Sequence, residues 1–306
     1  YTPDYYLGTT TGGSTSITLT NLGMYGDDPL FPARVEVCDV FVDVTSTVSQ
    51  TPTEQADCTA NGVGAPSTWV NTTTSVSGLS NITNSVTQQC LTVIPPVVTK
   101  AFSPTVINPF GVSTLTFTVT KDPATLNVAA GPISFVDTLP ANIKVASTPS
   151  IATTCPVGSG GPGGTIVANS GDGTITLNGL MGPAAGQLGC TISVNVTSGV
   201  GQTSAEQTGC LANDGTAPTA WVNTTSSITG VANVNNGVTQ QCLTVVPPTL
   251  TKSFYLPQIM EGGVSTLTFT ITKDASLVAQ AASNIGFTDN LPANLFVATP
   301  SSMNTT

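Results

Sequence analysis

The sequence predicts an all-β protein that consists of tandem antiparallel β-sandwich domains, with about 152 residues per repeat. The first supporting observation is internal repetition, because landmark residues recur 152 positions further along the chain. The recurring pairs are Cys38 and Cys190, Cys58 and Cys210, Cys90 and Cys242, Trp69 and Trp221, Lys100 and Lys252, and Asp137 and Asp289. A tandem array, in which each unit contacts mainly its neighbours, indicates a structural or surface protein.

The second observation is the alternation of apolar and polar residues, which is typical of strands with one buried face. Residues 113–120 place Leu115, Phe117 and Val119 on one face and threonines on the other. Residues 189–197 repeat the pattern around Cys190 and further apolar residues. Further strands are predicted at 97–102, 133–137, 143–146, 165–168, 174–177, 221–228 and 238–245. Seven to nine short strands per unit predict an Ig-like sandwich, and no helix of useful length is expected.

The third observation is composition. Threonine and valine are abundant, and β-branched residues favour strands. Charged residues make up only 7% of the chain, against about 25% in typical soluble proteins. With six basic residues, no histidine and a net charge of −10, the chain is poorly suited to bind nucleic acid or an anionic membrane surface. No apolar stretch approaches the ~20 residues of a membrane span, so membrane insertion is not expected.

The repeat predicts three domains. Residues 1–96 are the later part of an Ig-like repeat, residues 97–248 are a complete repeat, and residues 249–306 are the early part of the next. We expect the sequence to be a window on a longer chain; the alternative is that neighbouring subunits complete each other by strand exchange. Paired prolines at 95–96 and 247–248 mark the junctions and favour stiff, extended backbone.

The seven cysteines predict a structural disulfide framework. The proposed pairs are Cys155–Cys190, Cys210–Cys242 and Cys58–Cys90, and Cys38 is left without a partner in this sequence. Cysteines at fixed spacing in a β-rich chain indicate an oxidising, extracellular compartment. Zinc is excluded because paired Cys-x-x-Cys motifs and histidines are absent, and no cofactor is expected.

Several segments resemble the "conserved repeat" Ig-like domains of bacterial surface proteins, which form long tandem arrays with a prealbumin-like β-sandwich. The similar segments are 243–254, 262–272 and 287–294, together with 138–142, 154–155 and 190–194. The resemblance covers about two thirds of each unit and departs from the family at 198–241. It implies surface display and a stalk or fibre role, and it implies no enzyme activity.

Three rare polar residues in the complete repeat form a candidate reactive site: Lys100, Asp137 and Asn223. Surface domains that form intramolecular isopeptide bonds use the same order: a lysine on the first strand, an acid in the middle of the domain and an asparagine on the last strand. Burial would lower the pKa of the lysine and raise that of the acid. The neutral amine could then attack the asparagine amide while the protonated acid polarises its carbonyl. Glu206 is the reserve acid.

A plainer interpretation stays open for the same residues: Lys100 reaches the surface to pair with Asp137, and Asn223 caps a turn. Weaker signals are Asn-x-Thr sequons, which could carry glycans, at Asn71, Asn81, Asn195, Asn223 and Asn304. Acidic residues at 27–28 and 171–173 suit turns better than Ca²⁺ sites. Trp69 and Trp221 are expected to be core or interface anchors.

These features favour a structural subunit of an extracellular filament, stalk or surface fibre. Its expected partners are copies of itself, joined head to tail or by strand exchange, and covalent glycans. We do not expect an enzyme, because the sequence has no histidine, no plausible reactive cysteine and no recurring pair of carboxylates close in sequence. The alternative is the repeat region of a cell-surface adhesin that binds a host, surface or carbohydrate ligand, with loop 22–34 as the contact patch.

Overall fold

The computed structural model describes residues 11–19, 39–59, 67–156, 164–212, 216–277 and 280–305. The chain divides into two compact units, Tyr1–Ser46 and Thr47–Thr306. Within the described residues of the first unit, 11–19 and 39–46, no helix or strand forms. The second unit is mostly β, with several sheets and two short α-helices among its described residues.

The larger sheet contains the two strands with the clearest alternation. Strand β5 (Val112–Thr120) lies between β3 (Val97–Ser103) and β11 (Gly189–Thr197), and both pairings are antiparallel. Short strands extend the sheet: β14 (Asn235–Asn236) beside β3, and β7 (Lys144–Val145) and β8 (Ala152–Thr153) beside β11. The pairing of β14 with β3 is parallel.

The second sheet has the order β13-β6-β10-β9. Its strands are β13 (Ile228–Ala232), β6 (Pro132–Thr138), β10 (Thr174–Met181) and β9 (Thr165–Val167). All its pairings are antiparallel, and register irregularities interrupt β10 and β13.

Both sheets bury their apolar faces in one shared core. The predicted inward residues Leu115, Phe117 and Val119 are fully buried on β5. Phe117 meets Phe135 of the opposite sheet, with ring centroids 5.2 Å apart and the rings tilted. The two sheets therefore pack face to face across residues 97–245, which is a β-sandwich core.

The segment after β11 differs from the prediction. Residues 221–228 do not form one strand: β12 (Val222–Asn223) ends where the 3₁₀ turn η3 (Thr225–Ser227) begins. Residues 238–245 are likewise divided into β15 (Gln241–Cys242), which pairs with β12, and β16 (Thr244–Val245), which pairs with β4 (Val106–Ile107). An unpredicted helix, α2 (Ser204–Ala212), precedes them.

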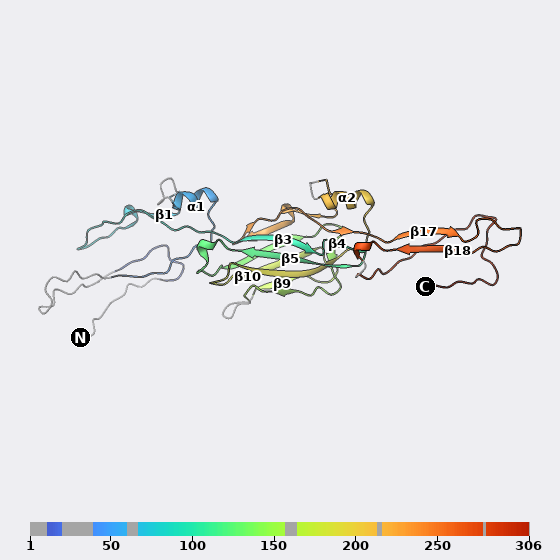
Figure 1. Cartoon of the computed structure of the whole chain (residues 1–306). Helices are drawn as coiled ribbons and strands as arrows, with labels where there is room; N and C mark the ends of the chain where they lie inside the picture. Colours follow the sequence, from blue (N-terminus) through green and yellow to red (C-terminus); the bar gives the residue numbers. More distant parts are fainter. Residues whose placement is uncertain are drawn as a thin grey trace. The chain divides into compact units, whose positions relative to one another are not determined.

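The flanking segments reproduce elements of the sandwich at the 152-residue interval (Figure 1). Helix α1 (Pro52–Thr59), strands β1 (Val70–Asn71) and β2 (Gln89–Cys90), and turn η1 (Thr73–Ser75) match α2, β12, β15 and η3. The hairpin of β17 (Thr249–Phe254) and β18 (Leu267–Thr272), followed by turn η4 (Ala275–Leu277), matches β3, β5 and turn η2 (Pro123–Thr125). The domain boundaries derived from the sequence stay predictions.

Candidate functional site

Lys100 occupies an inward position of β3. It alternates with Val98 and Phe102, which are also buried, and it lies opposite Phe117 of β5. The exposed fraction of its side chain is 0%. The strand register therefore places a lysine amine inside an apolar core, where an ammonium ion is costly unless it is paired.

Asp137 supplies the paired group from the opposite sheet. It lies on β6 between Ile175 of β10 and Ile228 of β13, and its side chain is also fully buried. Its Oδ1 accepts a hydrogen bond from Lys100 Nζ at 2.8 Å. Since β3 and β6 belong to different sheets, this contact connects the two halves of the sandwich.

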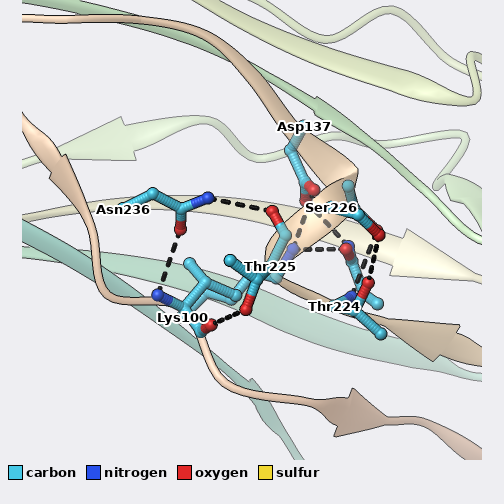
Figure 2. Close-up of polar contacts among 9 residues, drawn as sticks. Lys100, Asp137, Thr224, Thr225, Ser226 and Asn236 are labelled. Carbon is cyan, nitrogen blue, oxygen red and sulfur yellow. Dashed lines mark hydrogen bonds and ion pairs between the residues drawn. The ribbon is translucent and has the colours of Figure 1, made fainter.

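Asn223, the last residue of β12, completes the site and is 0% exposed. Its Oδ1 accepts a hydrogen bond from Lys100 Nζ, and its Nδ2 donates to Asp137 Oδ2 at 2.9 Å. A tight turn fixes its position, because Thr224 N donates to Ser227 Oγ at 3.1 Å. Figure 2 shows Lys100 and Asp137 beside this turn.

The backbone next to Asn223 is held by a disulfide and by a buried aromatic residue. Val222 pairs with Cys242, which is bonded to Cys210 of α2. Trp221 is 1% exposed, and its Nε1 donates to Glu206 Oε1 at 3.0 Å. Helix α2, the Cys210–Cys242 disulfide and Trp221 therefore fix the position of β12, the strand that carries the Asn223 side-chain amide.

Burial shifts the protonation of this pair. Removal from water lowers the pKa of Lys100, an effect that the Asp137 carboxylate opposes. Burial raises the pKa of Asp137, against the opposing influence of Lys100 and of the Asn223 hydrogen bond. Both shifts favour the uncharged forms, a neutral amine beside a protonated carboxyl group.

This geometry brings together a nucleophile, an electrophile and an acid. The amine nitrogen contacts the carbonyl side of the Asn223 amide, and Asp137 contacts its nitrogen. Asp137 therefore faces the amide nitrogen of Asn223, which is the leaving group. The sequence-based hypothesis placed Asp137 at the carbonyl oxygen of Asn223 instead, but that oxygen accepts a hydrogen bond from Lys100. The plainer interpretation of a surface ion pair is wrong, because both side chains are buried.

Comparison with known protein families gives a match over most of the chain. A domain described as "Domain of unknown function (DUF7933)" matches residues 96–245 and 248–306. The chain belongs to the DUF7933 family. A search of curated proteins found no match.

Glu206, the reserve acid, lies outside the triad of the complete DUF7933 domain. Its Oε2 accepts from Thr203 N at 2.7 Å and its Oε1 from Trp221, so it caps α2 and holds the tryptophan. Hydrogen bonds from Thr203 and Trp221, the Thr203 backbone first, hold the pKa of Glu206 below its ordinary value. The pattern Thr-x-x-Glu at 203–206 is a capping-box signal, which could have predicted the helix.

The second DUF7933 match contains a more open copy of the site. Lys252 Nζ lies 2.6 Å from Asp289 Oδ1, but the two side chains are 56% and 21% exposed. Asn71, the counterpart of Asn223, is exposed on β1. Among the described residues, all three groups meet only in the complete domain.

Three disulfides are present: Cys58–Cys90, Cys155–Cys190 and Cys210–Cys242. These are the pairs that the sequence predicts, and Cys38 lies outside the described residues. Three intramolecular disulfides indicate an oxidising environment of the extracellular type. None of the described helices has the length and apolar character needed to cross a membrane.

The weaker sequence signals fall in varied places. Of the sequon asparagines, Asn71, Asn81 and Asn304 are exposed, Asn195 is half-buried, and Asn223 is inaccessible to a glycan in the folded domain. Trp69 is half-buried, and its Nε1 donates to Glu54 Oε1, as Trp221 does to Glu206. Asp172 accepts from the side chain of Asn169 at 3.0 Å in a turn. The acidic pair at 27–28 and loop 22–34 lie outside the described residues. Among the described residues, no cluster of three or more His, Cys, Asp or Glu side chains could hold a metal ion.

Proposed function

We propose that the chain is a structural segment of an extracellular filament, stalk or surface fibre. In this proposal, each complete DUF7933 domain is locked by an isopeptide bond between Lys100 and Asn223. The observation that carries the proposal is the fully buried contact of an amine, an amide and a carboxyl group. A buried charged pair is a poor way to stabilise a core, because desolvation offsets its attraction. A site of this kind is better explained by chemistry than by stability alone.

The reaction is an amide exchange within one chain. Lys100 Nζ, as the neutral amine, forms a bond to Asn223 Cγ, and the bond from Cγ to Nδ2 breaks. Asp137 Oδ1 takes a proton from Nζ, and Oδ2 gives a proton to Nδ2, which leaves as ammonia. Asp137 is protonated both before and after the reaction, so the step consumes no reactant from outside the domain. Since it occurs once per domain on the protein itself, the protein is not an enzyme for an external substrate.

The fibre role rests on repetition and on the surface. Helix, disulfide and hairpin elements recur at a fixed interval, and DUF7933 matches the chain twice. A chain with 7% charged residues relies little on charge for solubility, which suits a polymer that is covered by neighbouring copies or by glycans. We further propose that the repeats are Ig-like domains of the "conserved repeat" type, displayed at the cell surface. No described residue favours the adhesin alternative.

Intact-mass measurement of the purified chain tests the crosslink. We expect a mass lower than the sequence mass by one ammonia beyond the hydrogens lost to disulfides, and a branched peptide that joins Lys100 to Asn223 after digestion. Asp137→Asn should restore the full mass, because the proton carrier is lost. Glu206→Gln is the matched control and should keep the ammonia loss. A wild-type chain of full mass would refute the bond.

Electron microscopy of native material tests the fibre role. Negative staining with an antibody against the chain should label long, uniform fibres or stalks. Label confined to dispersed globular particles would refute that role and leave the crosslink unaffected.

A further inference from the structure

The reaction assigned to the Lys100 site depends on how firmly two separate strands are held together. Lys100 lies on β3 and Asn223 lies on β12, and these strands belong to different sheets. A lysine amine sits on a flexible stem, so its contact with an amide is productive only if both strands are fixed in one geometry. A misplacement of about 1 Å can lower the rate of such a reaction about 100-fold. The residues that fix β12 against β3 therefore matter to the chemistry.

Strand pairing fixes Asn223 relative to the acid. After β12 the chain forms turn η3 and then β13, whose first residue, Ile228, pairs with Asp137 of β6. The turn is closed by a hydrogen bond from Thr224 N to Ser227 Oγ. A short, closed turn therefore connects the residue that carries the amide to the strand beside Asp137.

Asn236 connects the same turn to the strand that carries the lysine. It lies on β14, where it pairs in parallel with Val98 of β3, close to Lys100. Its side chain makes two hydrogen bonds to the backbone: Nδ2 donates to Thr225 O at 2.9 Å, and Oδ1 accepts from Val238 N at 3.1 Å. Figure 2 shows the Asn236 side chain directed toward Thr225. One amide thus joins the strand next to β3 with turn η3.

Thr225 adds a second bond between these two segments, because its Oγ1 donates to the backbone oxygen of Val238, a buried residue. The backbone between Asn236 and Val238 lies directly against β3. Gly237 N donates to Val98 O at 3.0 Å, and a Cβ on Gly237 would lie only 2.4 Å from a side-chain carbon of β3. The segment that begins with β14 is therefore held by β3 on one side and by η3 on the other.

The same hydrogen bonds recur at the 152-residue interval. Asn84 Nδ2 donates to Thr73 O at 3.0 Å, and Asn84 Oδ1 accepts from Val86 N at 3.0 Å. Thr73 Oγ1 likewise donates to Val86 O at 2.6 Å. Because the same residue types make the same bonds twice, the local sequence specifies this network. At the Lys100 site the network also lies between the two reactants.

From this arrangement we infer that Asn236, with Thr225 as its partner, is a positioning residue for the bond between Lys100 and Asn223. The inference rests on the proposed function and names the residues that hold its two reactants in contact. Asn236 bonds to backbone groups of Thr225 and Val238, so it acts on the reaction by fixing η3, and with it Asn223, against β3. The balance of the reaction is unchanged: Lys100 Nζ joins Asn223 Cγ and ammonia leaves.

The test measures the rate of bond formation separately from folding. The full chain is purified in denaturant from inclusion bodies, before the domain can react, and is then refolded in oxidising buffer. Tryptophan fluorescence follows folding, and intact mass follows the loss of ammonia. We expect Asn236→Ala to fold and then to lose ammonia about 100-fold more slowly than the wild type, because the amide is no longer held at the amine. Asn84→Ala removes the matching bonds away from the site; it is the matched control and should react at the wild-type rate.

Two variants of Thr225 keep the inference testable if Asn236→Ala fails to fold. Thr225→Val removes the hydroxyl group at similar volume and should also slow ammonia loss, whereas Thr225→Ser keeps the hydroxyl group and should react like the wild type. A purely structural role would lower stability on a Lys100→Met background, where no bond forms, and would leave the rate of ammonia loss in the folded variants at the wild-type value. That unchanged rate, or an Asn84→Ala chain as slow as Asn236→Ala, would overturn the inference and leave the proposed function intact. A wild-type chain that never loses ammonia would instead refute the crosslinking chemistry itself.

Discussion

Substitution of Lys100 by methionine separates a covalent lock from a buried ion pair. Methionine keeps an unbranched apolar side chain in the core and removes the amine. Asp137 is left without its cation, but burial already raises its pKa, so it can stay protonated and hydrogen-bonded to Asn223. The variant therefore removes the bond with little uncompensated buried charge.

The magnitude follows from the loop that the bond would close. Lys100 and Asn223 are 123 positions apart, and the chain-entropy relation for a crosslink of this span gives about 5 kcal/mol of stabilisation. Lys100→Met should lose most of this free energy of unfolding. It should also raise the denaturant m-value, because the unfolded chain is no longer held compact by the link.

The assay is urea unfolding without reductant, followed by the fluorescence of buried Trp221. Lys121→Met is the matched control: Lys121 is also buried, and among the described residues its Nζ donates to backbone carbonyls, including Val128 O at 2.6 Å. The control should lower stability without a change in m-value or in ammonia loss. An unchanged m-value for Lys100→Met would refute the covalent lock.

Three further predictions concern the supports of the site. The rate of bond formation, followed by intact mass after refolding from denaturant, should be constant over an intermediate pH range, because the neutral pair and the ion pair carry the same number of protons. The rate should fall at low pH, where Lys100 is an ammonium ion, and at high pH, where Asp137 is a carboxylate. A rate that rises steadily with pH would contradict this mechanism. Replacing Cys210 and Cys242 together by serine should cost about 4 kcal/mol, since the loop spans 32 residues, and a urea midpoint equal to that of the wild type would contradict the estimate of loop entropy. The depressed pKa of Glu206 stabilises α2 above the unfolded pKa and stops doing so as pH falls through the folded value. The protection factors of the α2 amides in hydrogen exchange should therefore fall at acidic pH, and Glu206→Gln should abolish this dependence.

The sequence was most informative where one residue pattern had one structural solution. Strands β3, β5 and β11 follow alternation with a mostly apolar inner face, and a slip of one residue would expose every inner side chain. The same alternation puts Lys100 on the inner face, where its polarity breaks the pattern. A polar residue at an apolar position, repeated 152 residues later, was the signal for the site.

Other features depend on contacts that a pattern does not contain. The break after Asn223 comes from the Thr224–Ser227 side-chain turn, which ends β12 inside a segment rich in β-branched residues. Helix α2 has one buried residue, Cys210, so its periodicity is weak. The assignment of Lys100 and Asp137 to opposite sheets follows from strand pairing over long separations, so the sequence alone could not predict it.

The positions of the triad along the chain give the lock a mechanical consequence. Lys100 lies in the middle of β3, the first strand of the complete domain, and Asn223 lies on β12 towards the other end of the domain. A pull on the two ends of the domain therefore passes through the bond and leaves residues 101–222 without load. The shielded 123-residue span corresponds to about 400 Å of extended chain. In single-molecule stretching with the disulfides reduced, Lys100→Met should therefore release about 400 Å more length per complete domain than the wild type. Equal extensions in the two proteins would mean that no covalent link carries the force, and the sandwich would then depend on its core and hydrogen bonds alone.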